Sequence, residues 1–250
     1  MNYNWNWQIF WEESPDATGT YMDTLLSGLA WTLATALCAW LIALLIGIVI
    51  GTIRTLPSKW AVRAANAYIE LFRNIPLLVQ MFLWYFVMPE LLPEAIGNWL
   101  KALPNASFVT AVISLGLFTS ARVAVQVSAG IDSLSVGQKQ AGTALGFRLS
   151  ETYRYILLPQ AMRMVVPPLT NEFLNIIKNS AVALTIGLME LTARARSMQE
   201  FSFQVFEAFT AATLIYVLVN VCVVLLMHGL EKKAAIPGAD AASRPQSGSH

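Results

Sequence analysis

The uncharged run at residues 24–53 constrains the fold more than any other feature of this chain. It contains no Asp, Glu, Lys or Arg. A helix that crosses the hydrocarbon core of a bilayer needs about 20 mostly apolar residues, so this run is long enough for one tilted span. The composition agrees, because 56% of the residues are hydrophobic, 12% are charged, and the mean hydropathy is +0.55. The sequence therefore predicts a membrane protein.

Four further segments have the length and apolar character of membrane spans. They are residues 61–88, 106–131, 162–189 and 208–230. Three of them contain ionisable side chains, among them Glu70, Arg73, Arg122, Glu172 and Lys178. Because such side chains are costly in lipid, we expect them to face protein or water. We predict an all-α, polytopic membrane protein with about five transmembrane helices in one domain, residues 23–232.

Lys and Arg concentrate on one side of these five spans, and this bias predicts the orientation. With the N-terminus outside, the cytoplasmic side receives Arg54, Lys59, Arg63, Lys139, Arg148, Arg154, Arg163, Lys232, Lys233 and Arg244. The outer side receives only Lys101, Arg194 and Arg196. We therefore expect residues 1–22 to be an external segment. Residues 233–250, rich in Ala, Ser, Pro and Gly, are predicted to be a disordered cytoplasmic tail.

The chain lacks the sequence patterns of several functions. No G-x-x-x-x-G-K-[ST] phosphate-binding loop occurs, so we expect no ATP site of that kind. His228 and His250 have no accompanying Asp or Cys constellation, which argues against an enzyme or a metal site. Cys38 and Cys222 each lie inside an apolar run, where we expect them to pack rather than to form a disulfide. The sequence thus predicts a protein that is not an enzyme and binds no cofactor itself.

A polar stretch at about residues 137–159 separates the third and fourth predicted spans. Residues 140–145 favour a short helix, and Gly146 permits the positive φ that ends a helix sharply. Ser150 can start a second helix, and Pro159 begins the next span, where a missing N–H is harmless. We predict a compact helix-turn-helix on the cytoplasmic face. A solvated loop with ordinary turn glycines is the alternative.

A polar stripe runs along the fourth predicted span. At about 100° per residue its members fall within an arc of roughly 120°; they are Asn171, Glu172, Asn175, Lys178 and Asn179. Pro167 and Pro168 should kink or locally unwind the helix before the stripe, which frees backbone carbonyls. Amides, carbonyls and a lysine on one face suit the passage of a zwitterionic solute. The alternative is that the Asn side chains only hold helices together.

Glu70 and Arg73 lie three positions apart in the second predicted span. Side chains at this spacing are neighbours on one helix face and can form an ion pair. We therefore predict that they form a structural pair that braces the helix.

The polar stretch at residues 137–159 resembles the coupling loop of bacterial ABC importer membrane subunits, whose pattern is E-A-A-x-x-x-G-x9-I-x-L-P. The matching residues are Gln140, Ala141, Gly142, Gly146, Ile156, Leu158 and Pro159. Gln140 and Gly142 replace the Glu and the second Ala of that pattern. In the family this loop docks in a groove of the cytoplasmic ATPase. The resemblance implies that these residues couple ATP hydrolysis to transport.

The resemblance covers nearly the whole chain and narrows to the polar amino-acid uptake branch of the family. Two stretches match its signatures: YIELFRNIPLL at residues 68–78, and the VKNS-like Ile177-Lys178-Asn179-Ser180, which adds Ser180 to the predicted path. NWNW at residues 4–7 and PELLPE at residues 89–94 are similar to glutamate/aspartate importer subunits. Val125 and Ser128 stand where relatives commonly place Glu and Arg.

The resemblance implies a permease subunit of an ATP-driven importer of polar, acidic amino acids in the bacterial inner membrane, with a periplasmic N-terminus. The implied partners are a cytoplasmic ATPase dimer that binds ATP and Mg²⁺, a homologous second permease subunit and a periplasmic amino-acid-binding protein. The subunit would contact membrane lipid and no nucleic acid.

Two other functions stay open on the sequence alone. A secondary carrier would take a proton on Glu172 or Glu70 as its coupling ion; such carriers contain inverted repeats, and none is visible in this sequence. A non-transporting membrane scaffold would leave the charged residues of the fourth span as an unexplained cost.

Overall fold

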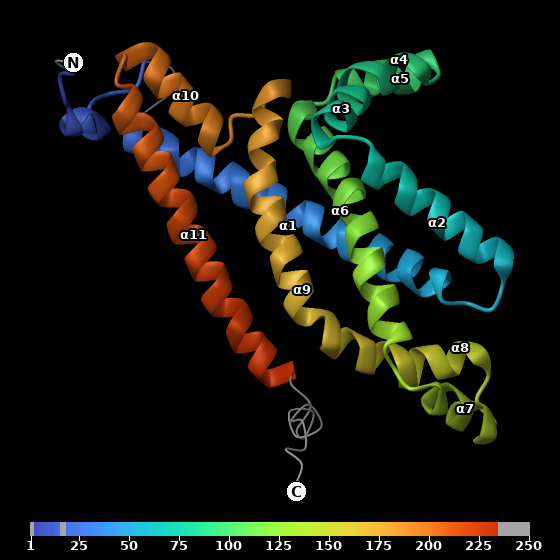
Figure 1. Ribbon diagram of the computed structural model, residues 1–250. Helices are drawn as coiled ribbons and strands as arrows, with labels where there is room; N and C mark the ends of the chain where they lie inside the picture. Colours follow the sequence, from blue (N-terminus) through green and yellow to red (C-terminus); the bar gives the residue numbers. More distant parts are fainter. Residues whose placement is uncertain (1–2, 16–18, 235–250) are drawn as a thin grey trace, which may run out of the picture.

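The computed structural model describes residues 3–15 and 19–234, and most of these residues are helical (Figure 1). In chain order the helices are η1 (Trp7–Trp11), α1 (Tyr21–Arg54), α2 (Lys59–Asn74), α3 (Leu77–Phe82), η2 (Leu83–Val87), α4 (Met88–Leu91), α5 (Glu94–Lys101), α6 (Ala106–Asp132), α7 (Val136–Ala144), α8 (Leu149–Thr152), η3 (Tyr153–Leu157), α9 (Leu158–Asn179), η4 (Ser180–Ile186), α10 (Leu191–Ser202) and α11 (Val205–Ala234). These described residues contain no β-strand, which confirms the predicted all-α fold. The predicted tail lies outside the described residues from residue 235 onward.

The helices provide up to five membrane spans, as predicted. α1, α6 and the Val205–Gly229 part of α11 are each long and apolar enough to cross a membrane. Two bent pairs supply the others, Lys59–Asn74 with Leu77–Leu91 at 99° and Leu149–Ile186 with Leu191–Ser202 at 51°. The first bend follows from Pro76, because a proline disfavours helical backbone at the preceding residue, and Ile75 is extended with ψ 126°.

The connecting helices gather at two opposite ends of the bundle (Figure 1). α10 and the α4–α5 pair lie at one end, together with the N-terminal segment. α7 and α8 lie at the other end, as does the end of α11. This arrangement is the one that the predicted topology requires, because the segments expected outside lie together and away from the polar stretch expected in the cytoplasm.

α1 packs most extensively on α6. The buried face of α1 carries small residues at close to every fourth position: Gly28, Thr32, Thr35, Ala36, Ala39, Ala43, Gly47 and Gly51. Small side chains let two helix backbones approach closely, which is how helices commonly associate in membranes. The helix begins with reciprocal caps between Thr20 and Asp23, in which the Thr20 N–H donates to Asp23 Oδ2 at 2.9 Å and the Asp23 N–H donates to Thr20 Oγ1 at 3.3 Å.

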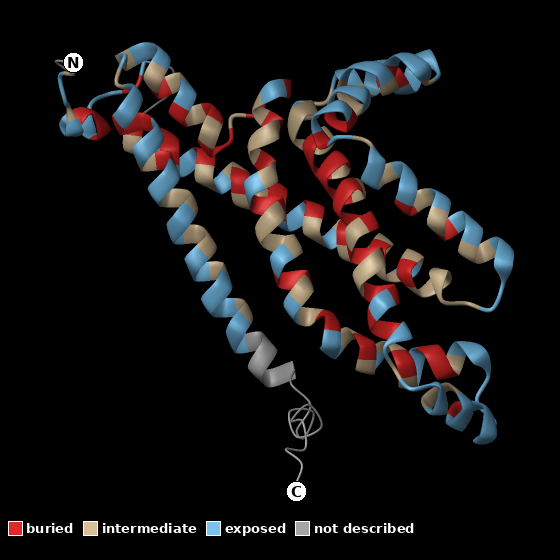
Figure 2. Cartoon of the chain, viewed as in Figure 1, coloured by how far each residue is buried: buried red, intermediate tan, exposed pale blue. Residues whose placement is uncertain are grey.

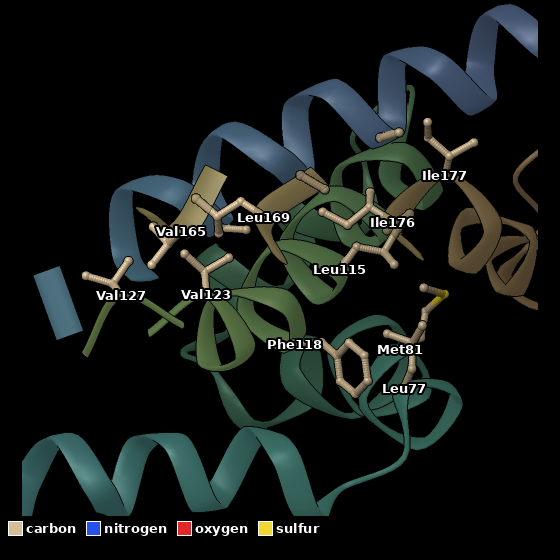
Figure 3. Packing of buried hydrophobic residues seen from close by; sticks show 14 of the residues in the cluster. Leu77, Met81, Leu115, Phe118, Val123, Val127, Val165, Leu169, Ile176 and Ile177 are labelled. Atoms are coloured by element: carbon tan, nitrogen blue, oxygen red, sulfur yellow. The ribbon is translucent and has the colours of Figure 1, made fainter. Parts of the chain in front are cut away.

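One apolar cluster joins α3, α6 and α9 beside α1 (Figure 3). Figure 3 labels Leu77, Met81, Leu115, Phe118, Val123, Val127, Val165, Leu169, Ile176 and Ile177, none of which is more than 8% exposed. By contrast, α2 and α11 expose most of their residues (Figure 2). The described bundle therefore has a packed centre and leaves a wide apolar face on α11, whereas the exposed face of α2 is mixed and carries charged side chains.

α9 continues as one helix through Pro167 and Pro168, so of the two expected outcomes, a kink or a local unwinding, the unwinding is wrong. Each proline removes one backbone hydrogen bond from the helix interior. Val165 and Leu169, on either side of the pair, are both buried at 4% exposure. Their packing against neighbouring helices holds the backbone helical despite the missing donors.

Two π-helical turns, η2 and η3, each end two residues before a proline, Pro89 and Pro159 respectively. A proline ring crowds the carbonyl four residues earlier and cannot donate to it, and a wider π turn relieves that crowding. Pro159 is the second residue of α9, near its predicted position at the start of a span. Because of η3, however, the chain is helical without a gap from α8 into α9.

The N-terminal segment is folded onto the ends of α1, α10 and α11. The Tyr3 hydroxyl donates to Glu207 Oε2, and the Asn6 N–H donates to Glu207 Oε1 at 2.8 Å. Ile9 and Phe10 of η1 are buried in a second apolar cluster with Leu191 of α10. The segment is thus an integral part of the described fold.

Candidate functional site

A polar hollow of about 270 Å³ lies between α2, α6 and α9. Arg73 comes from the last turn of α2, Arg122, Val125 and Gln126 come from α6, and Glu172 comes from α9. The hollow therefore unites ionisable residues from all three spans in which the sequence showed charge. Glu172 is the only predicted path residue among those that line it.

Arg122 and Glu172 face each other across this hollow. Arg122 Nη1 lies 3.9 Å from Glu172 Oε2, with side-chain exposures of 42% and 12%. This distance allows charge attraction but exceeds a hydrogen bond, and Glu172 Oε2 is buried without a hydrogen-bond partner in the described chain. The Arg122 guanidinium also lies 4.7 Å from the centroid of the Phe118 ring, which holds it over an aromatic face. A partly desolvated carboxylate oxygen without a hydrogen-bond partner can accept from a cationic donor.

The rest of the polar stripe lies on the face of α9 that is not packed into the core. Asn171 and Lys178 are exposed, whereas Asn175 and Asn179 are half-buried. Ser180 differs from these, because it is fully buried and its hydroxyl donates to the Ile177 carbonyl at 2.8 Å. Its geometry is that of a residue in the packed interior.

Glu70 and Arg73, the predicted structural pair, are both exposed, and the described residues contain no ion pair between them. Arg73 instead lines the hollow. The spacing brought the two residues to one face of α2, but Arg73 at the last turn of the helix extends toward α6 and α9.

The polar stretch at residues 137–159, called the coupling loop below, folds into α7, a tight turn, α8 and η3. Gly146 has φ +81°, as predicted for a sharp helix end. The second helix starts at Leu149, because the Arg148 N–H is capped by Glu151 Oε2 at 2.7 Å, rather than after Ser150. In a capping box, the acidic side chain three residues after the N-cap accepts from the N-cap backbone N–H. Glu151 does this for Arg148, which fixes the start of the helix.

Gly142 is buried where α7 contacts α8 and η3. A Cβ atom at this position would lie 2.8 Å from Thr152 Cγ2, 2.9 Å from Thr152 Oγ1 and 3.2 Å from Ile156 Cδ1. The two arms of the coupling loop approach so closely here that an alanine, which the importer pattern has at this position, would fit only if Thr152 or Ile156 moved. Glycine at residue 142 thus follows from the packing of this loop.

The outer surface of the coupling loop is apolar to an unusual degree. Leu145 is 74% exposed and Val136 is 72% exposed, and Phe147, Leu149 and Tyr155 are also exposed. Gln140, Ala141, Gly146 and Pro159 lie on the exposed surface as well, while Ile156 and Leu158 are half-buried beneath it. Contiguous exposed apolar side chains outside the spans are typical of a protein-binding surface.

Sequence reasoning missed Gln126 and the meeting of Arg73 with Arg122. Arg73 lies on α2, and Arg122 and Gln126 lie on α6, so no spacing within one helix predicts that they line the same hollow. A signal did exist for Arg122, because a charge inside an apolar span is a functional indicator in its own right.

The fold and these sites define a class, a polytopic α-helical membrane subunit with a polar hollow between its spans and an exposed helical loop at one end. Residues 43–236 match the family described as "Binding-protein-dependent transport system inner membrane component". The chain belongs to this family of ABC importer permeases.

Relatives and solved structures agree with this assignment. The chain is 48% identical over 241 residues to the glutamate/aspartate import permease protein GltJ of Escherichia coli K12, covering 95% of this chain and 98% of that protein. It is 28% identical to the glutamine transport system permease protein GlnP of the same organism, over 92% and 98% of the two chains. A crystal structure of an amino acid ABC transporter with histidines matches at 30% identity and a TM-score of 0.72, over 85% and 95% of the two chains. The MetNI methionine ABC transporter, at 17% identity and a TM-score of 0.73, shares the fold.

Several statements follow directly from family membership. The chain is an inner-membrane component of an ATP-driven importer that works with an ATPase and a binding protein. ATP hydrolysis belongs to the separate ATPase subunit, so this chain is a transport subunit and not an enzyme. A proton-coupled secondary carrier is not favoured.

Proposed function

We propose that this permease subunit admits acidic amino acids, glutamate and aspartate, and that the polar hollow between α2, α6 and α9 is part of their path. The near relative in E. coli is named for these two amino acids, and it matches this chain over almost its entire length. The observation that carries the proposal is the set of charges that line the hollow.

Arg73 and Arg122 complement the two carboxylates of an acidic amino acid. A planar guanidinium donates two parallel hydrogen bonds to a carboxylate, which is the strongest form of this contact. The unpartnered Glu172 Oε2 would accept from the ammonium group of the same solute. Two arginines and one glutamate give the lining a net charge of +1, opposite to the −1 of glutamate or aspartate.

The other predicted path residues extend the proposal along α9. Asn171, Asn175, Lys178 and Asn179 lie on its unpacked face, where a polar solute would find donors and acceptors beyond the hollow. Ser180 would support this wall from behind rather than touch the solute, because its hydroxyl is already bonded to its own helix.

We infer that a homologous second permease subunit closes the path, since the hollow and the unpacked face of α9 are open in the single chain. An ATPase dimer, which holds ATP and Mg²⁺, would dock on the coupling loop through the exposed apolar side chains. Residues 1–22 would lie in the periplasm, where the amino-acid-binding protein delivers the solute, and the C-terminus would lie in the cytoplasm. Residues 23–232 form the permease domain in this scheme, and membrane lipid surrounds it.

Arg122→Gln tests the proposal in proteoliposomes that contain the complete importer. A hydrogen bond to a charged group contributes about 1.5–3 kcal/mol, so we expect the rate of glutamate uptake at low concentration to fall roughly 10- to 100-fold. Uptake of glutamine should fall less. Glutamine has one carboxylate and glutamate has two, so the loss of one of the two arginines leaves glutamine with a partner for its carboxylate.

The matched control is Arg63→Gln. Arg63 lies on the same bent pair as Arg73, but its guanidinium is placed over the Trp60 ring, 5.0 Å from its centroid, and does not line the hollow. This variant should transport as the parent does. Parental glutamate uptake in Arg122→Gln, with the preference for glutamate over glutamine unchanged, would exclude the hollow as the substrate path.

A further inference from the structure

Tyr153 of the coupling loop is bonded to the end of the first span. Its side chain is 5% exposed, and its hydroxyl donates to the Thr55 carbonyl at 2.6 Å. The Thr55 hydroxyl in turn donates to Tyr153 Oη at 3.2 Å. Thr55 directly follows α1, where the last carbonyls of a helix lack partners within the helix. The loop therefore supplies a donor to an otherwise unsatisfied helix end.

The neighbouring residue, Arg54, connects the same helix end to two more spans. Its Nε donates to Asn66 Oδ1 of α2 at 3.0 Å, and its Nη1 donates to Ser128 Oγ of α6 at 2.9 Å. Ser128 is 1% exposed, and its hydroxyl donates to the Val125 carbonyl at 3.0 Å. Residues 54 and 55 thus bond to α2, to α6 and to the coupling loop at once.

This junction matters because of how the coupling loop is attached. The backbone joins the loop only to α6 before it and α9 after it. A displacement of the loop therefore reaches α1 and α2 through contacts between elements, and the Tyr153 hydrogen bond is the contact that joins α1 to the loop itself. The ring of Tyr153 is fixed on its other side by Lys139 of α7, whose Nζ lies 5.8 Å from the ring centroid. Because Tyr153 lies on η3 and Lys139 on α7, both arms of the loop contact the Tyr153 ring, and we expect the ring to move together with the loop.

We propose that Tyr153 is a positioning residue for transport, which passes the displacement of the coupling loop to α1 through the Thr55 carbonyl, while Arg54 distributes it to α2 and α6. The inference rests on the proposed docking of the ATPase on the coupling loop. It adds a specific link between that docking site and the spans that carry Arg73 and Arg122. With the link intact, one movement of the loop shifts both arginine-bearing helices relative to Glu172 on α9.

Tyr153→Phe in the complete importer tests this link, because it removes the hydroxyl and keeps the buried ring. The measured quantity is glutamate transported per ATP hydrolysed in proteoliposomes, together with the amount of ATPase that copurifies. We expect the ATPase to stay bound and ATP hydrolysis to continue, while glutamate transported per ATP falls about two- to tenfold, the effect of one lost hydrogen bond. Thr55→Val removes the longer bond to Tyr153 Oη and the bond from the Thr55 hydroxyl to the Thr52 carbonyl, but it leaves the carbonyl that accepts from Tyr153, so it should reduce the ratio less.

The outcomes separate the inference from the function on which it rests. An unchanged ratio in Tyr153→Phe would overturn the inference alone. Loss of the ATPase during purification of this variant would also overturn it, because Tyr153 would then serve only to fold the loop. A parent importer without ATP-driven uptake of glutamate would overturn the proposed function and this inference with it.

Discussion

Gly142 and Gly146 lie four residues apart in the coupling loop, and each is required for a different physical reason. Gly142 has ordinary backbone angles but no space for a Cβ atom, whereas Gly146 has space on all sides but a φ of +81°. A β-carbon at residue 146 would cost about 1 kcal/mol through backbone strain alone. The turn chemistry of Gly146 was predictable from the local sequence. The role of Gly142 was not, because it depends on Thr152 and Ile156 across the turn.

Gly146→Arg should uncouple transport from ATP hydrolysis. No heavy atom lies within 4 Å of the position of a Cβ at residue 146, so a side chain can leave the backbone there without a clash, and a long cation would obstruct the proposed docking surface. The chain should insert at the parental level, while the ATPase is lost during purification and uptake of glutamate falls to background.

Gly146→Asn is the control for this variant. Asn tolerates positive φ better than other residues with a β-carbon, and its side chain is short and uncharged. It should retain the ATPase and most of the uptake. If Gly146→Arg forms a stable complex and transports at the parental rate, the loop is an ordinary connection and does not dock the ATPase.

At the scale of single elements, the packing of the N-terminal segment onto the helices is the clearest feature that the sequence did not predict. Composition and charge predicted only an external segment, but Tyr3 and Asn6 bond to Glu207 at the start of α11. The contact spans almost the entire chain, so no local pattern could reveal it. Glu190 is a second contact between elements that no local pattern revealed. It caps α10 and also accepts from Tyr216 Oη of α11 at 2.9 Å.

Tyr3→Phe should loosen the N-terminal segment without affecting the membrane spans. A hydrogen bond to a carboxylate contributes about 1.5–3 kcal/mol, and its loss should expose Ile9, which is 4% exposed in the intact fold. Cysteine introduced by Ile9→Cys should react with a water-soluble maleimide several-fold faster in the Tyr3→Phe background.

Trp11→Cys provides the reference for this labelling experiment. Trp11 is 73% exposed, so cysteine at residue 11 should react at the same rate in both backgrounds. Equal labelling rates at residue 9 with and without Tyr3 would show that its hydrogen bond does not hold the segment in place.

α9 illustrates where packing overrides a sequence rule. Two consecutive prolines in a helix interior favour a kink or a local unwinding, and the prediction of one or the other followed from that rule. Buried Val165 and Leu169 kept the helix intact. The physical cost of proline is visible instead at η2 and η3, where a π turn precedes Pro89 and Pro159. The rule about proline therefore predicted correctly that helix hydrogen bonding would be disturbed. The disturbance lies before Pro89 and Pro159, whereas α9 stays helical at Pro167 and Pro168.

For the whole molecule, hydropathy and charge predicted the class of fold and the five spans, because these depend on the bilayer and not on contacts between helices. The sequence also singled out Glu172, which lines the hollow, and its role in the substrate path stays a prediction. It could not predict the hollow, since three helices distant in sequence bring Arg73, Arg122 and Glu172 together. The packing of α1 on α6 did leave a sequence signal, small residues at close to every fourth position of α1, from which this packing was not predicted.

The topology of the whole chain makes a direct prediction. Ser135 directly precedes α7 and Asn98 lies on α5, and both are exposed. The helices α5 and α7 lie at opposite ends of the bundle (Figure 1). In a background without Cys38 and Cys222, cysteine at residue 135 should be labelled by an impermeant reagent only from the cytoplasm. Cysteine at residue 98 should be labelled only from the periplasm, and labelling of both from one side would refute the orientation.

The most direct test of the account is the energy source of uptake by the complete importer in proteoliposomes. We predict that labelled glutamate accumulates only when ATP and Mg²⁺ are present on the ATPase side, and that an imposed proton gradient neither replaces ATP nor changes the rate. Unlabelled aspartate should compete with glutamate, whereas lysine should not. Glutamate uptake that follows the proton gradient and proceeds without ATP would contradict the account.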